Sequence, residues 1–470
     1  MDTLNTTEVA DMTAVELAEL FKTKQLSPVE ALSASLNRID KYNNIVNAYC
    51  HVAEEQALVA AKQSEQRWFK KQQLSPIDGV PSSIKDLTLV KGMPNRNGSL
   101  TSSTKLAEID APFTQKMKQA GAVILGKTTT PEFGWKGVTD SRLSGNTCNP
   151  WNTNLTAGGS SGGAACAAAL NMGVLHQASD AGGSIRIPAA FCGVFGIKPT
   201  FGYIPQWPAS AMTTLSHLGP ITRTVKDSLL MMDYVATPDS RDWYSSRQLN
   251  NKWSDTVLTP LKGIKIAYSP TLGYVDVNPK VLSLTDHAVK ILEELGASVS
   301  VVDPGFSDPI DTFSTLWFAG AAKTVESFTL EQRELLDPGF LEIGLKGKDI
   351  DIVEYMKAAD SRADLGQKMQ SFLSEYDLLI TPTLPNVAFA VGQNTETADQ
   401  EHWMQWTPFS YPFNLTQQPA LSIPCGEVDG LPVGLQIVAD RGKDLLAINA
   451  AMHIEQALPT VFLSTPRSFS

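Results

Sequence analysis

Residues 158–163 read Gly-Gly-Ser-Ser-Gly-Gly, and residues 180–186 read Asp-Ala-Gly-Gly-Ser-Ile-Arg. Between these two clusters, residues 163–171 predict a small-residue helix and residues 173–179 predict a buried strand. A flexible linker would not lead directly into packed elements in this way. Glycines at junctions between strands and helices let the backbone approach a ligand closely. The two clusters therefore predict one site, with Ser184 placed just beyond the end of a strand.

The rest of the chain alternates helices with strands. Thr13 with Glu16, and Ser27 with Glu30, form capping boxes that begin two N-terminal helices, and Asp429-Gly430 is typical of a hairpin turn. The other predicted elements are helices at 53–63, 113–120, 279–294 and 443–457 and strands at 122–125, 264–268, 298–302, 377–381, 420–424 and 432–438. This alternation predicts an α/β fold, a single large α/β/α layered domain around a mixed, twisted central sheet.

One domain is expected to span residues 1–470. Its predicted parts are an N-terminal helical part at 1–65, a catalytic core at 75–235, peripheral insertions at 240–262 and 304–370, and a C-terminal part of the same sheet at 371–470. The chain shows no repeat, no low-complexity segment and no linker that would divide it.

Composition excludes several classes of function. The net charge is -11 and no basic run occurs, which argues against nucleic acid as a partner. No signal peptide and no apolar run of about 18 residues is visible, so we expect a cytoplasmic protein without a membrane segment. Five cysteines without a CxxC pair predict reduced thiols. The six histidines show no metal-ligand spacing, and neither a metal nor a cofactor is expected.

A serine nucleophile needs a base, because a free hydroxyl is a weak nucleophile at neutral pH. No histidine has a setting comparable to the two clusters, although His217 stands in a segment that fits the edge of a site. Lys85 ends an apolar stretch that begins Gly-Val-Pro and is followed by Asp86. Burial disfavours the charged form of an amine, so a buried Lys85 would serve as a base. A salt bridge between Lys85 and Asp86 is the alternative interpretation.

Three further motifs allow different interpretations. Residues 121–128 match the pattern of a phosphate-binding loop, but their apolar variable positions predict a strand instead of an open turn. Residues 159–163 fit G-x-S-x-G, which would make Ser161 the nucleophile, but residues 150–157 read as a polar loop where that motif needs a strand. Ser82 and Lys85 fit S-x-x-K, and the S-D-N and K-T-G motifs that accompany it elsewhere are missing.

Together these residues resemble the amidase signature family over nearly the whole chain, most densely at 145–200. The family's lysine lies in a Gly-Val-Pro-x-x-x-Lys-Asp context, which Lys85 meets. Its bridging serine is the first serine of Gly-Gly-Ser-Ser-Gly-Gly, Ser160, and its nucleophile ends the later Gly-Gly-Ser at Ser184, 24 residues further on. Segments 412–420 and 431–436 match as well. Ala181 stands where many members carry Thr, Ile or Gly, and only its backbone is implicated.

The resemblance implies an amidase that converts a small aryl or aliphatic amide to a carboxylate and ammonia or an amine. Ser184 would be the nucleophile, Ser160 (after a cis peptide bond) the proton relay and Lys85 the base. The resemblance further implies an oxyanion hole of backbone N–H groups at Ala181, Gly182, Gly183 and Ser184, and supporting roles for Ser161, Asp180 and Arg186. An aromatic acyl pocket, with packing as the equal alternative, is expected from Trp135, Tyr203, Trp207 and His217.

Two other functions stay open. One branch of the family is the glutamine-hydrolysing subunit of tRNA-dependent amidotransferases, but residues 355–362 lack the Gly-Tyr-Tyr-Asp-like stretch usual in that branch. A binding protein that keeps the fold without activity is the other function, and the intact Lys85, Ser160 and Ser184 argue against it. A small-molecule amide is the expected partner, and a homodimer is left open.

Overall fold

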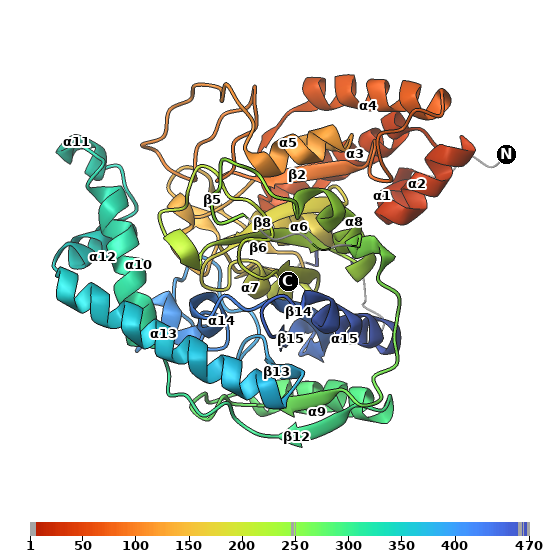
Figure 1. Ribbon diagram of the computed structural model, residues 1–470. Coiled ribbons are helices and arrows are strands. Elements are labelled where there is room, and N and C mark those ends of the chain that lie inside the picture. Colours follow the sequence, from red (N-terminus) through yellow and green to blue (C-terminus); the bar gives the residue numbers. More distant parts are fainter. Residues whose placement is uncertain (1–5, 246–248, 250, 459–462, 464, 468–470) are drawn as a thin grey trace.

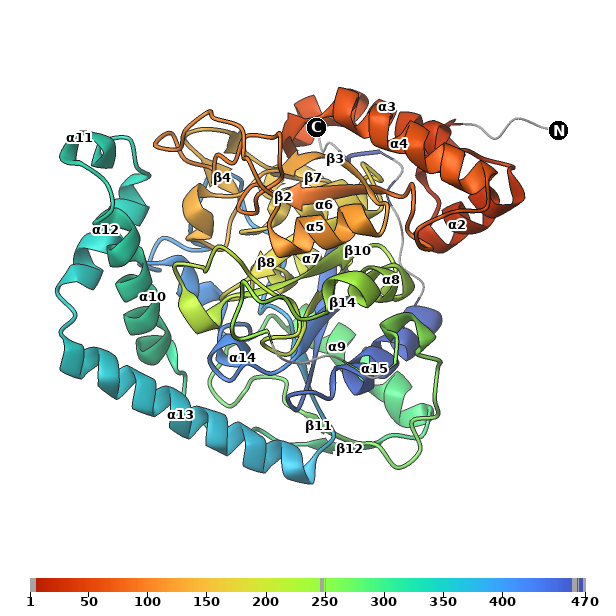
Figure 2. The same cartoon turned by 45° about the horizontal axis from the view of Figure 1, so that its top comes forward.

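The computed structural model describes residues 6–245, 249, 251–458, 463 and 465–467. Its centre is an 11-stranded sheet with the order β1-β3-β2-β8-β10-β9-β14-β15-β13-β11-β12. In that order the strands are Tyr49–Val52, Val123–Thr128, Pro81–Lys85, Leu175–Asp180, His217–Thr222, Phe195–Lys198, Ala420–Val428, Leu431–Ala439, Leu378–Pro382, Lys265–Tyr268 and Ser298–Val301. Figures 1 and 2 show helices packed around this twisted sheet.

The sheet is mixed, which confirms the prediction from the sequence. β2 pairs in parallel with β3 and β8, and β11 pairs in parallel with β12 and β13. The other neighbours are antiparallel, including the β14–β15 hairpin, whose turn residues Asp429 and Gly430 have φ of 51° and 79°. Every residue of β3, β8, β10 and β15 is buried, which is typical of a sheet covered on both faces.

Fifteen α-helices surround the sheet within the described part of the chain. They are α1 Thr6–Ala10, α2 Ala14–Thr23, α3 Pro28–Val46, α4 Glu54–Phe69, α5 Pro112–Gln119, α6 Gly162–Ala169, α7 Arg186–Cys192, α8 Val225–Val235, α9 Pro279–Glu294, α10 Ile310–Val325, α11 Leu330–Arg333, α12 Pro338–Lys348, α13 Ile352–Glu375, α14 Pro412–Leu415 and α15 Asp444–Ala457. Both predicted capping boxes are present, at the starts of α2 and α3. Helix α4 extends beyond the predicted 53–63 because its buried face continues to Trp68.

One predicted loop is a strand. The sequence predicts a polar loop over residues 150–157, but β7 (Asn152–Thr156) pairs with β6 (Cys148–Asn149) in a separate two-stranded sheet. Pairing with β6 and a bridge from Leu155 to Ala390 satisfy its backbone, which the polar composition does not reveal. Because this strand lies outside the central sheet, it does not build a nucleophile elbow at Ser161.

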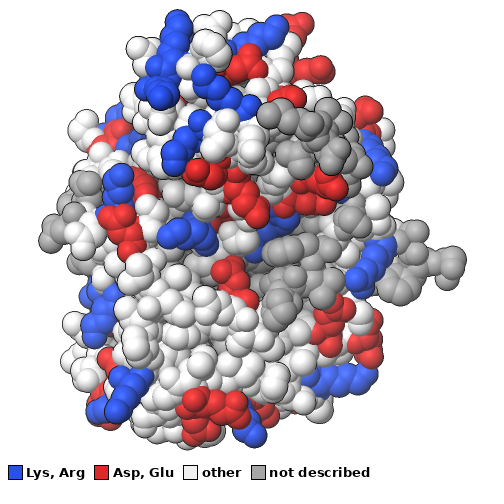
Figure 3. Space-filling view, turned by 90° about the vertical axis from the view of Figure 1, so that its right-hand side faces the viewer, with Lys and Arg blue, Asp and Glu red and all other residues white. Residues whose placement is uncertain are grey.

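Helices α10 to α13 come from the segment predicted as a peripheral insertion, and Figure 1 shows them along one edge of the molecule. Helix α10 packs mainly on α12 and α13. On the face drawn in Figure 3, acidic and basic side chains are interspersed and form no single basic patch. All five cysteines are free thiols. Among the described helices, none combines the length and the apolar character that a bilayer crossing needs.

Candidate active site

The parallel pairing of β2 and β8 brings the two predicted motifs together. Ser82 lies opposite Leu175 and Ser83 opposite His176, so the two strands end at the same edge, at Lys85 and just before the second glycine cluster. Helix α6 begins there too, directly after Ser160 and Ser161. Parallel strands and the helix between them therefore deliver the lysine and both serine clusters to one place.

The backbone at the first cluster requires glycine. A Cβ atom on Gly159 would lie 2.4 Å from the carbonyl carbon of Val138, closer than any side chain fits. The peptide bond between Gly159 and Ser160 is cis, as the resemblance implied. Because Gly159 has no side chain, the backbone can pass close to Val138 at the position just before Ser160.

Lys85 is fully buried and its side-chain nitrogen meets three hydroxyl groups. The Nζ atom lies 2.7 Å from Ser160 Oγ, 2.8 Å from Ser161 Oγ and 3.0 Å from Ser179 Oγ. Burial lowers the pKa of Lys85 well below its ordinary value of 10.5, and the more distant charge of Asp180 opposes this only partly. Burial therefore favours the neutral form of the amine, which carries a lone pair.

Asp86 does not pair with Lys85, so the salt-bridge interpretation is wrong. Its carboxylate lies 3.2 Å from Lys127 Nζ, and it accepts the backbone N–H of Arg96 at 3.2 Å. Lys127 belongs to the stretch that matches a phosphate-binding loop, and that stretch is the buried strand β3. The strand predicted at residues 122–125 is confirmed, and it continues to Thr128 as β3.

Ser160 and Ser161 differ in the hydrogen bonds that their hydroxyl groups make. Ser161 Oγ donates to the carbonyl oxygen of Ser179 at 3.1 Å and accepts the N–H of Ser179 at 3.3 Å. Ser160 Oγ contacts Lys85 and makes no other hydrogen bond to the described residues. The proton of Ser161 is thus engaged by the backbone, whereas the proton of Ser160 is available for transfer.

A buried ion pair holds the second cluster. Arg186 Nε and Nη2 each lie 2.9 Å from a carboxylate oxygen of Asp180. Arg186 also donates to the carbonyl of Ser410, to Gln436 and to Asn414, which come from the C-terminal part of the chain. Burial alone would raise the pKa of the Asp180 carboxyl, but the guanidinium overrides this and holds the pKa below its ordinary value. The predicted supporting residues Asp180 and Arg186 thus contact each other.

One of the four predicted oxyanion donors is already engaged. The N–H of Gly183, whose φ is +122°, donates to Asp180 Oδ1 at 2.8 Å. The N–H groups of Ala181, Gly182 and Ser184 make no hydrogen bond within the described part of the chain. The Asp180 side chain folds back over its own turn and engages the Gly183 N–H, which leaves the other three N–H groups as the open donors of the turn.

Ser160 and Ser184 line one cavity of about 280 Å³. The N–H of Ser161 donates to the carbonyl oxygen of Ser184 at 3.2 Å, which ties the two clusters together beside this cavity. Every described residue of its lining is uncharged, and much of the wall is apolar, with Leu87, Leu89, Phe133, Met212, Leu218 and Trp317. Trp317 and Thr324 belong to α10, so the segment predicted as a peripheral insertion supplies one wall of the cavity.

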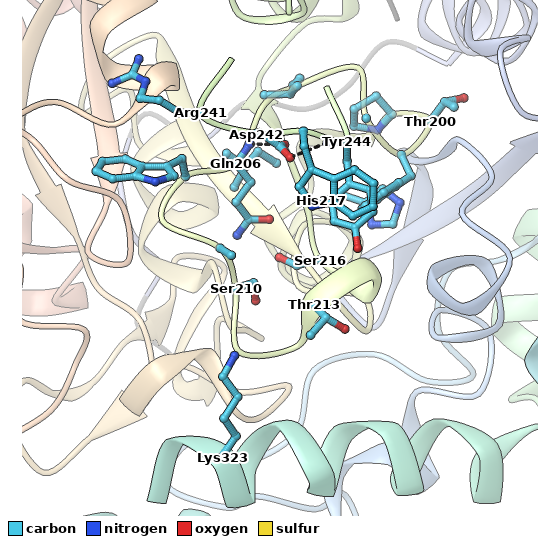
Figure 4. Close-up of a pocket in the computed structure, with 18 residues that line it drawn as sticks. Thr200, Gln206, Ser210, Thr213, Ser216, His217, Arg241, Asp242, Tyr244 and Lys323 are labelled. Atoms are coloured by element: carbon cyan, nitrogen blue, oxygen red, sulfur yellow. Dashed lines mark hydrogen bonds between the residues drawn. The ribbon is translucent and has the colours of Figure 1, made fainter. Parts of the chain in front are cut away.

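The four predicted pocket aromatics lie elsewhere. Trp135 packs on Phe340 of α12 at 6.4 Å between ring centres, and Tyr203 meets Trp253 edge-on at 5.6 Å. Trp207 and His217 line a neighbouring cavity, drawn in Figure 4. None of the four lines the cavity that holds Ser184.

Sequence reasoning missed Ser179 and Asn414. Ser179 is the last residue but one of β8, so its place beside Asp180 at a strand end was a usable signal. Asn414 donates to both the carbonyl oxygen and the carboxylate of Asp180, at 3.0 and 2.8 Å. Asn414 and Asp180 lie more than 200 residues apart in the sequence, so no local pattern reveals that they contact each other.

Comparison with known proteins now assigns the family. The family model described as Amidase matches residues 30–447. The chain belongs to the amidase signature family. An acylamidase of Rhodococcus erythropolis is 36% identical over 457 residues, which is 95% of this chain and 96% of that protein.

Two more amidase signature relatives show how far the likeness extends. The glutamyl-tRNA(Gln) amidotransferase of Clostridium botulinum (strain Kyoto / Type A2) has a subunit that is 29% identical, over 96% of this chain and 98% of that one. The crystal structure of a bacterial aryl acylamidase superposes with a TM-score of 0.90 at 29% identity, covering 95% and 96% of the two chains. This amidase signature protein is an enzyme that hydrolyses amide C–N bonds.

Proposed function

We propose that this enzyme hydrolyses a small, neutral aryl or aliphatic amide through an acyl-enzyme on Ser184, with Ser160 as proton relay and Lys85 as base. One observation carries the proposal. Lys85 is a buried amine that faces hydroxyl groups and no carboxylate within ion-pairing distance among the described residues. A neutral amine has a lone pair that accepts a proton, which is what a serine nucleophile requires.

The first half of the reaction forms the acyl-enzyme. Ser184 Oγ attacks the amide carbon while its proton passes to Ser160 Oγ, and the proton of Ser160 passes to Lys85 Nζ. The same proton returns through Ser160 to the departing nitrogen, so that the C–N bond breaks and the amine leaves neutral. Lys85 is then again a free base.

The second half uses the same relay on water. Water attacks the ester carbon and gives its proton through Ser160 to Lys85. The proton then returns to Ser184 Oγ as the C–O bond breaks, and the carboxylic acid departs and gives its remaining proton to solvent to become the carboxylate. In both halves, backbone N–H groups of Ala181, Gly182 and Ser184 would stabilise the oxyanion. Loss of one such donor typically costs about 3–4 kcal/mol of transition-state stabilisation.

Glutamine hydrolysis is the second candidate, because subunits of glutamyl-tRNA(Gln) amidotransferases align over nearly the full chain. The cavity lining favours the neutral amide. Free glutamine carries an ammonium and a carboxylate, and desolvating these charges without charged partners is costly. The lining around Ser184 offers uncharged groups to such a head group.

The test combines labelling with a substrate panel. A fluorophosphonate probe should modify Ser184 in the wild type and leave Ser184→Ala unlabelled, while Ser103→Ala, which changes an exposed loop serine, should label normally. Turnover of acetanilide-type and short aliphatic amides should exceed that of glutamine. A wild type that is neither labelled nor active on any amide would support the alternative that the chain is a binding protein without activity. Glutamine turnover above that of neutral amides would establish the second candidate.

A further inference from the structure

A second cavity of about 230 Å³ adjoins the one that holds Ser184 (Figure 4). The two cavities have five lining residues in common, namely Gln206, Ala209, Ser210, Ser216 and Leu218. The 206–218 segment therefore forms a shared boundary, and a molecule bound at Ser184 meets the second cavity across it.

Aromatic side chains form one part of the lining of the second cavity, which also includes the charged side chains of Arg241, Asp242 and Lys323. Phe201 meets His217 at 5.4 Å and Tyr244 at 5.2 Å between ring centres, both edge-on, so that the three rings form one continuous surface. Trp207 lies in the same lining. Edge-on rings of this kind leave faces on which another flat ring packs well.

Trp207 packs beside Arg241, which also lines the cavity. The guanidinium carbon of Arg241 lies 5.8 Å from the centre of the Trp207 ring. Arg241 is itself fixed by Asp239, at 2.9 and 2.8 Å, and by Gln115 at 2.6 Å. The indole is thus part of a wall that exists before any ligand binds, which reduces the entropy lost on binding.

The boundary between the cavities carries the polar side chains of Gln206, Ser210 and Ser216, of which Ser210 Oγ already accepts the N–H of Met212 at 3.1 Å. In Figure 4 the side-chain amide of Gln206 is directed toward Ser216. The backbone N–H of Gln206 donates to Asp242, but its side-chain amide and the Ser216 hydroxyl make no hydrogen bond to the described residues. Such groups fix the orientation of a ligand in a mostly apolar pocket.

We propose that the second cavity is a substrate subsite that takes the flat apolar end of an extended amide. This rests on the proposed function and narrows its substrate class to amides that carry an aryl group beyond the scissile bond and span both cavities. The reacting amide lies at Ser184, a polar link or ring substituent meets Gln206 and Ser216, and the distal ring packs between Phe201 and Trp207.

The experiment compares matched short and extended amides. One pair is acetanilide and 4-benzylacetanilide, and a second pair, benzamide and 4-benzylbenzamide, extends the acyl side. Trp207→Ala and Phe201→Ala should each lower kcat/KM by about tenfold for at least one of the two benzyl-substituted amides. For acetanilide and benzamide, kcat/KM should change by no more than about twofold. Phe69→Ala, which removes a ring that is 70% exposed, is the matched control and should change neither.

A binding measurement keeps the test independent of turnover. Ser184→Ala should bind the preferred extended amide about tenfold more tightly than Ser184→Ala combined with Phe201→Ala, as measured by calorimetry. Equal losses for short and extended members, together with equal affinity of these two variants, would overturn the subsite. If the proposed function itself is wrong, the result is different, because the wild type then turns over no amide at all.

Discussion

Replacing Ser160 and Ser161 one at a time should separate catalysis from stability. Among the described residues Ser160 Oγ is hydrogen-bonded to Lys85 alone, and we propose that its proton moves during the reaction. Ser160→Ala should therefore lower kcat by about 10²–10⁴-fold, the usual contribution of positioned acid–base catalysis. Its cost in stability should be that of one hydrogen bond, about 1 kcal/mol.

Ser161→Ala should show the opposite pattern, with a smaller loss of activity and a larger loss of stability. It removes one of three oxygens around Lys85 Nζ, a change worth about 0.5–1.5 kcal/mol, or up to roughly tenfold in rate. It also removes the hydrogen-bond partner of the buried N–H and carbonyl of Ser179, both of which bond to the Ser161 hydroxyl in the wild type. Each unsatisfied group costs about 1–3 kcal/mol, so this variant should be the less stable of the two.

The assay measures both properties on the same preparations. Initial rates on a chromogenic anilide give kcat, and thermal unfolding followed by circular dichroism gives the order of the midpoints. We expect Ser161→Ala to be the more active and the earlier to unfold. A folded but inactive Ser161→Ala beside an active Ser160→Ala would refute the reasoning and favour Ser161 as the reacting hydroxyl.

Three more predictions concern the charges and the backbone of the site. Since Lys85 must be neutral to act, kcat/KM should rise with pH through its lowered pKa, which pH–rate profiles check. Between this lowered pKa and the ordinary pKa of the unfolded chain, unfolding takes up a proton at Lys85. In that window stability relative to Lys85→Met should rise with pH by up to about 1.4 kcal/mol per unit, which denaturation at several pH values checks. Arg186→Met leaves Asp180 buried without its cation and should destabilise the fold by about 3–5 kcal/mol in denaturant titrations, with loss of activity. Gly159→Ala should abolish fluorophosphonate labelling because its Cβ meets a backbone carbonyl, whereas Gly366→Ala, with no atom within 4 Å, should label as the wild type does.

The sequence by itself determined the elements and the chemical groups of the site. Periodicity, capping residues and glycine clusters are local properties, so the capped helices, the 429–430 hairpin and a strand over residues 122–125 followed from neighbouring residues alone. Glycine clusters at strand ends and a lysine after an apolar run marked Ser184 and Lys85 as candidates, and the resemblance to the amidase signature family added Ser160 between them.

Tertiary structure alone decided which groups contact each other. Asp86 is adjacent to Lys85 in sequence, yet its partner is Lys127 on the next strand, because successive side chains of an extended chain point to opposite faces. The proton of Ser161 is engaged by Ser179, 18 residues away. The cavity walls come from α10 and from the 206–218 segment, and these contacts depend on packing across the whole chain. A hydrogen bond or a pocket wall depends on distance in space, and local sequence carries little information about that distance.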